Sequence, residues 1–324
     1  MIGYKKANLS IWQGRVDSES DYDSFLWHQH IQLLDMSLSL PIKDNKFKFV
    51  LIGYEVDEGI SLNKGRKGAQ EGPEKVIDFL RNKPCSFAKE VLLFDGGRIR
   101  LETSVEDAQA TLSKVVFKCL DNGYFPIVIG GGHDVAYGTM SGVLKKYPAN
   151  KNKLGLINFD AHFDMRPYKY STSGTMFRQI YDDINNQDGK FNHLTIGIQR
   201  SSTSRALFKY AKEINSEYVL AVDLLDQPQA ARKRLLNFID NQEYIYVSVC
   251  ADVFSSPYAP GVSSPQPLGI HPEKFLRLLI YIIKSKKMVA FDIAEIAPPL
   301  DASNATASLG GLIIYSLINT LVNE

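Results

Sequence analysis

Cysteine is scarce in this sequence, and its scarcity limits where the protein can work. The chain of 324 residues contains three cysteines, Cys85, Cys119 and Cys250. Their number is odd and their spacings show no pairing pattern, which excludes the disulfide scaffold of a small secreted protein. A reducing, cytoplasmic compartment is therefore expected.

An excess of charge of one sign is also lacking. Lysine and arginine together number 37, and aspartate and glutamate number 36. Nucleic acids and anionic membranes are bound through a concentrated basic face, so this balance argues against both and leaves a small molecule as the expected partner. No apolar run approaches the length of a membrane span, because the longest candidate, residues 275–283, is broken by Arg277 and ends at Lys284.

Short apolar runs rich in β-branched residues alternate with stretches of helical spacing. This alternation predicts an α/β fold, a three-layer αβα sandwich with helices on both faces of a mostly parallel sheet of about eight strands. No linker, charge block or repeat divides the chain, so residues 1–324 are expected to form a single domain, with residues 1–45 as an N-terminal arm packed on it. The predicted strands are residues 47–54, 91–95, 125–129, 154–159, 193–198, 218–222, 244–249 and 288–293, and the clearest helices are residues 74–80, 106–121, 232–239 and 272–284.

An acid, an imidazole and a second acid follow the fourth predicted strand at every other position. In extended backbone, alternate side chains point to the same face, so Asp160, His162 and Asp164 project together. At the end of a buried strand these groups would be poorly solvated unless a cation bound them. Each residue alone could have an ordinary structural role, as a capping acid, a paired imidazole or a turn acid. Together they predict a metal site.

Three further polar clusters come directly after predicted strands, where parallel sheets bind ligands. Residues 130–134 read Gly-Gly-Gly-His-Asp, and the glycines allow a sharp turn that brings His133 to the same edge of the sheet. A phosphate-binding loop is the alternative, although neither GxGxxG nor GxxxxGK[ST] is present. Cys250 and Asp252 end the seventh strand, where a cysteine is as often a packing residue as a ligand. Glu295 follows the last strand, as a substrate-binding carboxylate or as a solvated loop acid.

The strand ends at residues 160–164, 130–134 and 250–252 together offer more ligands than one tetrahedral zinc ion needs. They suit two metal ions, about 3.5–4 Å apart, that share carboxylates and turn a water molecule into a hydroxide nucleophile at neutral pH. Mixed oxygen and imidazole ligands favour Mn2+, although a cysteine favours softer ions. The predicted ligands are His133, Asp160, His162, Asp164, Cys250 and Asp252.

Motifs along almost the whole chain resemble one superfamily. They are Gly-Ala-Gln-Glu-Gly-Pro at 68–73, Gly-Gly-Gly-His-Asp at 130–134, Asp-Ala-His-Phe-Asp at 160–164, Asp252, Pro-Tyr-Ala-Pro-Gly at 257–261 and Asp-Ile-Ala-Glu at 292–295. In this order they resemble the ureohydrolases, which include arginases, agmatinases and formimidoylglutamases. The resemblance implies an arginase-like fold and a dimanganese site held by the six predicted ligands, with Cys250 in the remaining ligand position. It also implies a homo-oligomer, since relatives are often trimers or hexamers.

Within the superfamily, the chain is most similar to formimidoylglutamase. Phe177 stands where arginases have an active-site histidine, and Arg166 where they have an asparagine. The implied substrate is N-formimidoyl-L-glutamate, which is cleaved to L-glutamate and formamide in histidine degradation. Its two carboxylates suit arginine, which binds a carboxylate bidentately. The candidates for substrate binding are Arg166, Arg178, Arg66 and Phe177. Each arginine could instead make a surface or structural ion pair, and for Arg66 taken singly this alternative is favoured.

The resemblance also implies a mechanism, with two alternatives left open. Metal-bound hydroxide attacks the formimidoyl carbon, Asp164 holds the nucleophile and relays a proton, and Glu295 stabilises the cationic amidine. One alternative is a guanidino hydrolase of the arginase or agmatinase type, which would release urea. The other is a metal-binding but catalytically silent protein, because Cys250 replaces the usual bridging aspartate. A single sulfur is softer than a carboxylate and cannot span two ions with two oxygens.

Overall fold

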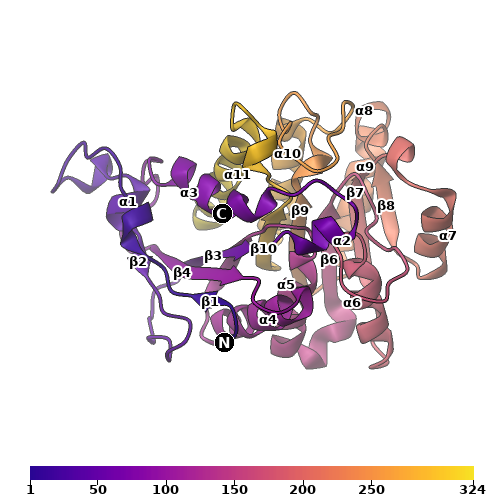
Figure 1. Cartoon of the computed structure of the whole chain (residues 1–324), viewed down its shortest axis with the longest axis horizontal. Helices are drawn as coiled ribbons and strands as arrows, with labels where there is room; N and C mark the ends of the chain where they lie inside the picture. The colour runs from indigo at the N-terminus through magenta and orange to yellow at the C-terminus, as the bar shows by residue number, and fades with distance from the viewer.

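A mostly parallel β-sheet forms the middle layer of the protein (Figure 1). The computed structural model describes residues 1–148 and 152–324. Within these residues the strands lie in the order β1-β4-β3-β5-β10-β9-β6-β7-β8, with β2 also paired to β4. Only β1 pairs antiparallel in the described part of the sheet. The strands are β1 (Tyr4–Lys5), β2 (Gln32–Leu33), β3 (Lys48–Glu55), β4 (Leu92–Arg100), β5 (Phe125–Ile129), β6 (Leu154–Phe159), β7 (Asn192–Ile198), β8 (Glu217–Leu220), β9 (Tyr244–Cys250) and β10 (Met288–Ala294).

All eight predicted strands are present, and β5 and β6 have the predicted bounds. The largest difference is β4, which continues five residues past the predicted end at Asp95, to Arg100. The polar Asp-Gly-Gly-Arg stretch interrupts the apolar run, but the backbone stays extended because β3 and β1 pair with it on either side. The Asp95 carboxylate is buried and paired with Arg98, at 2.6 Å between Oδ1 and Nη1.

Helices cover both faces of the sheet, which confirms the three-layer αβα sandwich (Figure 1). One hydrophobic cluster joins α3, α9, α10 and α11 to one face of the sheet. A second cluster joins α4, α5 and α6 to the other face. The helices are α1 (Trp27–His30), α2 (Glu58–Leu62), α3 (Gly72–Leu80), α4 (Val105–Asp121), α5 (Val135–Lys146), α6 (Met176–Asn185), α7 (Arg205–Glu213), α8 (Asp223–Asp226), α9 (Pro228–Asp240), α10 (Pro272–Lys284) and α11 (Ala305–Asn323).

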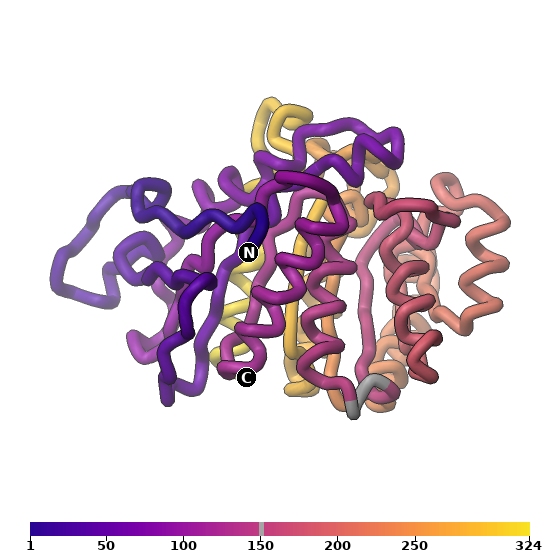
Figure 2. Tube along the Cα trace, turned by 60° about the horizontal axis from the view of Figure 1, so that its bottom comes forward, coloured from indigo at the N-terminus to yellow at the C-terminus, as the bar shows by residue number. Residues whose placement is uncertain are grey.

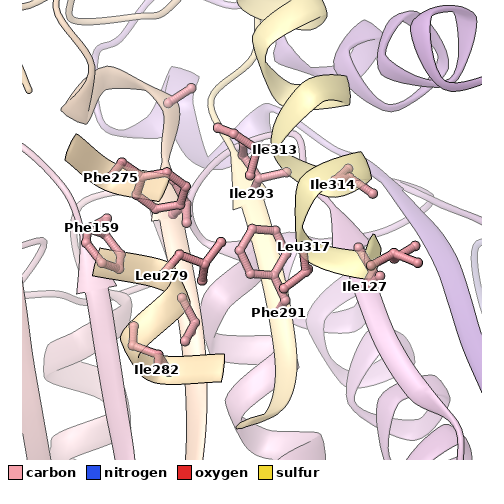
Figure 3. Packing of buried hydrophobic residues seen from close by; sticks show 14 of the residues in the cluster. Ile127, Phe159, Phe275, Leu279, Ile282, Phe291, Ile293, Ile313, Ile314 and Leu317 are labelled. Carbon is pink, nitrogen blue, oxygen red and sulfur yellow. The ribbon is translucent and has the colours of Figure 1, made fainter. Parts of the chain in front are cut away.

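The core on the α10 and α11 side is built from aliphatic and aromatic side chains that meet the strands directly (Figure 3). Phe275 of α10 lies edge-to-face on Phe159 of β6, with 4.8 Å between ring centroids. Ile313 and Leu317 of α11 pack toward Phe291 of β10 in the same layer. Each fully buried side chain of this size contributes about 1.5–3 kcal/mol relative to an exposed one, so this layer fixes the central strands firmly.

The last helix was not anticipated from the sequence. Residues 305–323 contain no charged side chain, and within the described residues α11 is the one helix long and apolar enough to cross a membrane by length and composition alone. Residues 275–283 are therefore not the longest apolar stretch, and that expectation was wrong. The small and hydroxyl side chains of α11 interrupt the apolar spacing by which a helix is recognised in the sequence. In the structure α11 is a core helix packed against α3 and α10.

Residues 1–45 extend one end of the sheet. The two short strands of this segment, β1 and β2, both pair with β4. The segment also buries Trp12 and Trp27, and the Trp12 indole donates a hydrogen bond to Asp95, 2.7 Å from Nε1 to Oδ2. Figure 2 shows the segment in indigo at the edge of the molecule.

The polar motifs follow four strands that are neighbours in the middle of the sheet. These strands, β5, β10, β9 and β6, are parallel to one another, so their carboxyl ends open on the same edge. The register keeps the ends level, since Ala294 pairs with Cys250 and Phe159 with Val249. Residues far apart in the sequence therefore meet just beyond this edge.

Candidate metal centre and active site

The predicted ligand side chains converge beyond the central strands. His133 Nδ1 lies 3.0 Å from an oxygen of Asp160 and 3.0 Å from an oxygen of Asp164. His162 Nδ1 lies 3.1 Å from Asp252 Oδ2 and 3.5 Å from Asp160 Oδ1. The structure thus brings these five side chains together, although they come from the ends of three different strands.

The convergent side chains form two groups that share one carboxylate. In the first group, His133, Asp160 and Cys250 offer ligand atoms that all lie within 4.8 Å of one another. In the second group, Asp160, His162 and Asp252 do the same. Asp160 turns Oδ2 toward His133 and Oδ1 toward His162, the arrangement of a carboxylate that spans two cations.

Buried atoms of the centre are suited to cations. The Oδ1 atom of Asp252 is buried and has no hydrogen-bond partner among the described residues. A carboxylate oxygen in that state loses its hydration without compensation unless a positive charge lies beside it. The donor set of imidazole, carboxylate and thiol groups therefore fits two divalent ions, with the softer sulfur of Cys250 on the side of His133.

Protons take the place of the cations when no metal is bound. Burial lowers the pKa of His162, but the charge of Asp252 and hydrogen bonds with Asp160 and Asp252 outweigh it and raise the pKa to about 12. Burial also lowers the pKa of His133, but hydrogen bonds to Asp160 and Asp164 and their charges outweigh it and raise the pKa well above its usual range. Burial also raises the pKa of the Cys250 thiol well above 9. All three groups therefore carry protons at neutral pH.

Metal binding is consequently expected to release protons and to weaken as the pH falls. Each ion displaces the proton from an imidazole Nδ1, and the ion beside Cys250 also displaces the thiol proton, which makes about three protons per pair of ions. Because protons and ions compete for the same atoms, affinity for Mn2+ should rise with pH through the neutral range. Calorimetric titration with Mn2+ in buffers of different ionisation enthalpy measures the number released. Binding without proton release would contradict this view of the centre.

A buried chain of hydrogen bonds orients the His133 ring through its Nε2 atom. Its Nε2 atom lies 3.0 Å from the Ser248 hydroxyl, which donates to Asp292 Oδ1 at 2.6 Å, and Tyr246 donates to the other oxygen of Asp292. Since the serine proton is directed to the aspartate, the hydroxyl accepts from Nε2–H and leaves the Nδ1 lone pair for a cation. The Phe177 ring lies edge-on to the imidazole, 5.5 Å between centroids. Ser248 was not predicted, although a serine inside a buried, apolar strand is a signal.

Glu295 is held close to the ligands by an unusual backbone turn. Its φ angle is +66°, and that of Asp164 is +48°, both in the left-handed region that non-glycine residues rarely adopt. The Glu295 carboxylate accepts a hydrogen bond from the backbone N–H of His133 at 3.0 Å, and its own N–H donates to Gly131. A side chain at position 131 would meet the Val56 carbonyl at 2.0 Å, so this turn requires glycine. Burial raises the pKa of Glu295 well above its usual value, reinforced by the charge of Asp252, so the carboxylate needs cations beside it, such as metal ions or an amidinium, to ionise.

A cavity of about 270 Å3 opens above the centre. Arg166 contributes to its wall, and the guanidinium donates to the Asn63 side chain at 3.4 Å. The remaining wall is mostly small and polar, and none of it was predicted. Besides the metal-centre residues, Arg166 and Glu295, the lining residues are Asn63, Lys64, Gly65, Ser173, Ser202, Thr203, Leu207, Ser263 and Ser264.

Three residues predicted to contact the substrate lie outside this lining. The Arg178 guanidinium covers the ring of Tyr210, 4.2 Å from its centroid. Arg178 follows Phe177 on α6, and consecutive helical residues are turned by about 100°, so the buried Phe177 directs Arg178 away from the centre. The Arg66 guanidinium donates to the backbone carbonyls of Val262 and Ser263, at 2.7 and 3.1 Å. Phe177 supports His133 rather than facing the cavity.

Known proteins are similar to this chain in sequence. The model of the arginase family matches residues 47–319. The chain is similar to a formimidoylglutamase of Clostridium tetani, 44% identical over 99% of this chain and 97% of that protein. It is also similar to a formimidoylglutamase of Legionella pneumophila, 40% identical over 99% of this chain and 98% of that protein.

Solved structures show the same fold. A variant of Trypanosoma cruzi formiminoglutamase with Mn2+ matches with a TM-score of 0.78 and 25% identity, over 89% of this chain and 98% of that chain. The formimidoylglutamase of Bacillus subtilis matches with a TM-score of 0.76 and 22% identity, over 89% of this chain and 92% of that chain.

Proposed function

Because the chain belongs to the arginase family, we propose that it hydrolyses N-formimidoyl-L-glutamate to L-glutamate and formamide. The observation that carries this proposal is the pair of ligand groups sharing Asp160 beneath a cavity whose wall includes Arg166. An anionic substrate suits that wall. A cationic substrate such as agmatine would be repelled by the same arginine.

Two Mn2+ ions serve as the cofactor, and when bound they supply an activated water molecule for attack on the formimidoyl carbon. We propose that His133, Asp160 and Cys250 hold one ion and that Asp160, His162 and Asp252 hold the other. Asp164, beside His133, completes the ligand set.

Two acidic residues are proposed to act on the reacting atoms. Asp164 orients the water, takes one of its protons on a carboxylate oxygen and passes it to the departing nitrogen. The oxygen of the water forms the new bond to the formimidoyl carbon. When the bond between that carbon and the departing nitrogen breaks, the remaining proton on the oxygen also passes to this nitrogen, so the products are the ammonium group of glutamate and the carbonyl of formamide. Glu295 faces the amidine and stabilises the positive charge on its nitrogens, which a preorganised carboxylate in a water-poor cavity does effectively.

Arg166 is the proposed substrate-binding residue among the arginines. It lines the cavity and presents a guanidinium that can bind a carboxylate bidentately. Arg178 and Arg66, whose guanidiniums are engaged elsewhere, are not needed for this role.

We further propose that the chain acts in the cytoplasm as a single domain with residues 1–45 as its arm, and as a homo-oligomer with no nucleic-acid or membrane partner. All three cysteines are free, which agrees with a reducing compartment. Two short strands of residues 1–45 pair with β4, which agrees with one domain.

The substrate is tested by the product released. The Mn2+-loaded protein should release formamide from N-formimidoyl-L-glutamate and little or no urea from arginine or agmatine. Release of urea from arginine at a comparable rate would instead make it a guanidino hydrolase. Absence of turnover on all three compounds, with both ions bound, would support the catalytically silent alternative.

A further inference from the structure

The structure leaves one carboxylate of the proposed substrate without a partner. N-formimidoyl-L-glutamate carries an α-carboxylate and a side-chain carboxylate, and Arg166 accounts for one of them. The other two arginines considered, Arg178 and Arg66, lie outside the cavity lining with their guanidiniums against Tyr210 and backbone carbonyls. A carboxylate that loses its hydration is compensated best by a charge-assisted bond, which a second cation in the wall would supply.

Lys64 is the one other lysine or arginine in the lining of the cavity, as far as the described residues show. It comes directly after α2, in a turn where its N–H donates to Ser61 and that of Gly65 donates to Ile60. The φ angle of Lys64 is +64°, the left-handed conformation that glycine or asparagine usually supplies after a helix. Lys286 adopts the same conformation after α10, at φ +58°, so the place of Lys64 in the cavity wall, rather than its backbone, is what marks it.

The ammonium group of Lys64 is available for a ligand. Within the described part of the chain it makes no ion pair or side-chain hydrogen bond. Lys67, three residues later, is different, because its ammonium is 2.6 Å from the Glu58 carboxylate. Lys64 is also exposed, but it lines the cavity and its ammonium has no partner in the described part of the chain.

We propose that Lys64 binds the α-carboxylate of the substrate while Arg166 binds the side-chain carboxylate, an inference that rests on the proposed function. The assignment follows from the two cavities. Lys64 lines only the inner cavity, together with the metal-centre residues. Arg166 also lines an adjoining outer cavity of about 430 Å3, with Tyr168, Lys169 and Tyr170, so the positive charge of that outer cavity comes from Arg166 and Lys169. The α-carboxylate is attached next to the reacting amidine nitrogen, whereas the side-chain carboxylate reaches farther out.

The test uses three substrates that differ only in their carboxylates. N-formimidoyl-L-glutamate has both, N-formimidoyl-γ-aminobutyrate lacks the α-carboxylate, and N-formimidoyl-L-glutamine has a neutral side chain. Lys64→Asn removes the charge and keeps a residue that tolerates positive φ. It should lower kcat/KM by about tenfold to a hundredfold for the glutamate and glutamine compounds, and by less than about twofold for the γ-aminobutyrate compound. Arg166→Met should lower kcat/KM for the glutamate and γ-aminobutyrate compounds and leave kcat/KM for the glutamine compound nearly unchanged.

Controls separate recognition from folding. Lys64→Arg should restore most of the activity, and Lys67→Asn should leave all three kcat/KM values near those of the unmodified protein. Equal losses of Lys64→Asn on all three substrates would overturn the proposal in favour of a structural role, and no loss on any of them would overturn it outright. If Lys64→Asn lowered kcat/KM for the γ-aminobutyrate compound but not for the glutamine compound, the assignment of Lys64 to the α-carboxylate would be overturned. If the unmodified, metal-loaded protein released no formamide from any of the three, the proposed function would fail and this inference with it.

Discussion

Replacing His162 by alanine is expected to abolish Mn2+-dependent turnover, with kcat falling by roughly a thousandfold or more. His162 is the imidazole ligand of the second group, and its Nδ1 atom lies 3.1 Å from Asp252 and 3.5 Å from Asp160. Without it, two carboxylates remain to hold an ion that no longer has the geometry to activate water. Elemental analysis of the purified variant should show loss of one of the two ions, and a formamide assay should show the loss of rate.

A matched variant shows whether the effect is specific. His28→Ala removes a half-buried imidazole from residues 1–45, whose Nε2 atom lies 2.8 Å from the Arg15 carbonyl oxygen and away from the metal centre. That variant should keep both ions and near-normal turnover. The mechanism would have to be abandoned if His162→Ala retained full Mn2+-dependent activity.

Replacing Glu295 by glutamine is expected to separate metal binding from catalysis. Glutamine keeps an oxygen that can accept the hydrogen bond from the His133 backbone, now 3.0 Å long, so the turn should survive. The negative charge that stabilises the amidinium is lost, and removal of one such preorganised group lowers kcat by about a hundredfold to a thousandfold. The readouts are kcat on N-formimidoyl-L-glutamate and metal content, of which only the first should change.

A second variant tests whether the negative charge of Glu295, rather than the shape of its side chain, supports catalysis. Glu295→Asp keeps the charge but shortens the side chain by one methylene, so it should recover only part of the rate. If Glu295→Gln instead lost metal while Glu295→Asp did not, Glu295 would belong to the metal centre and its proposed role in substrate stabilisation would be wrong.

The strands and the metal centre could be predicted because both depend on short-range patterns. A buried parallel strand is a continuous apolar run, and a run such as residues 154–159 is too short to be a typical buried helix. Ligands placed two apart after such a run share a face. Once several strand ends carry ligands, parallel pairing places them at one edge, and the observed order β5-β10-β9-β6 does this.

Directions of long side chains could not be predicted in the same way. Arg178 belongs to a stretch that resembles the relatives, but a helix points adjacent residues in different directions, and Phe177 takes the inward one. Arg66 lies in a loop whose carbonyl partners, Val262 and Ser263, come almost 200 residues later. No local pattern reveals that the guanidinium is already occupied.

Residues that were missed look ordinary in the sequence. Lys64 resembles any surface lysine after a helix, and its place in the cavity wall is what distinguishes it. Ser248 is one hydroxyl in an apolar strand, and its role depends on Asp292 in the neighbouring strand β10. Both depend on tertiary contacts that the sequence does not contain.

The wide separation of the ligands along the chain determines when the centre can form during synthesis. The second ligand group needs Asp252. The backbone of His133 is bound by Glu295, which lies 162 residues after His133 in the chain. The first ligand group joins the ends of β5 and β9, which are separated in the sheet by β10, so it cannot form until the last parallel strand has emerged and entered the sheet. We therefore expect the pair of manganese ions to be completed late in folding, so that it stabilises the centre of a sheet that has already formed.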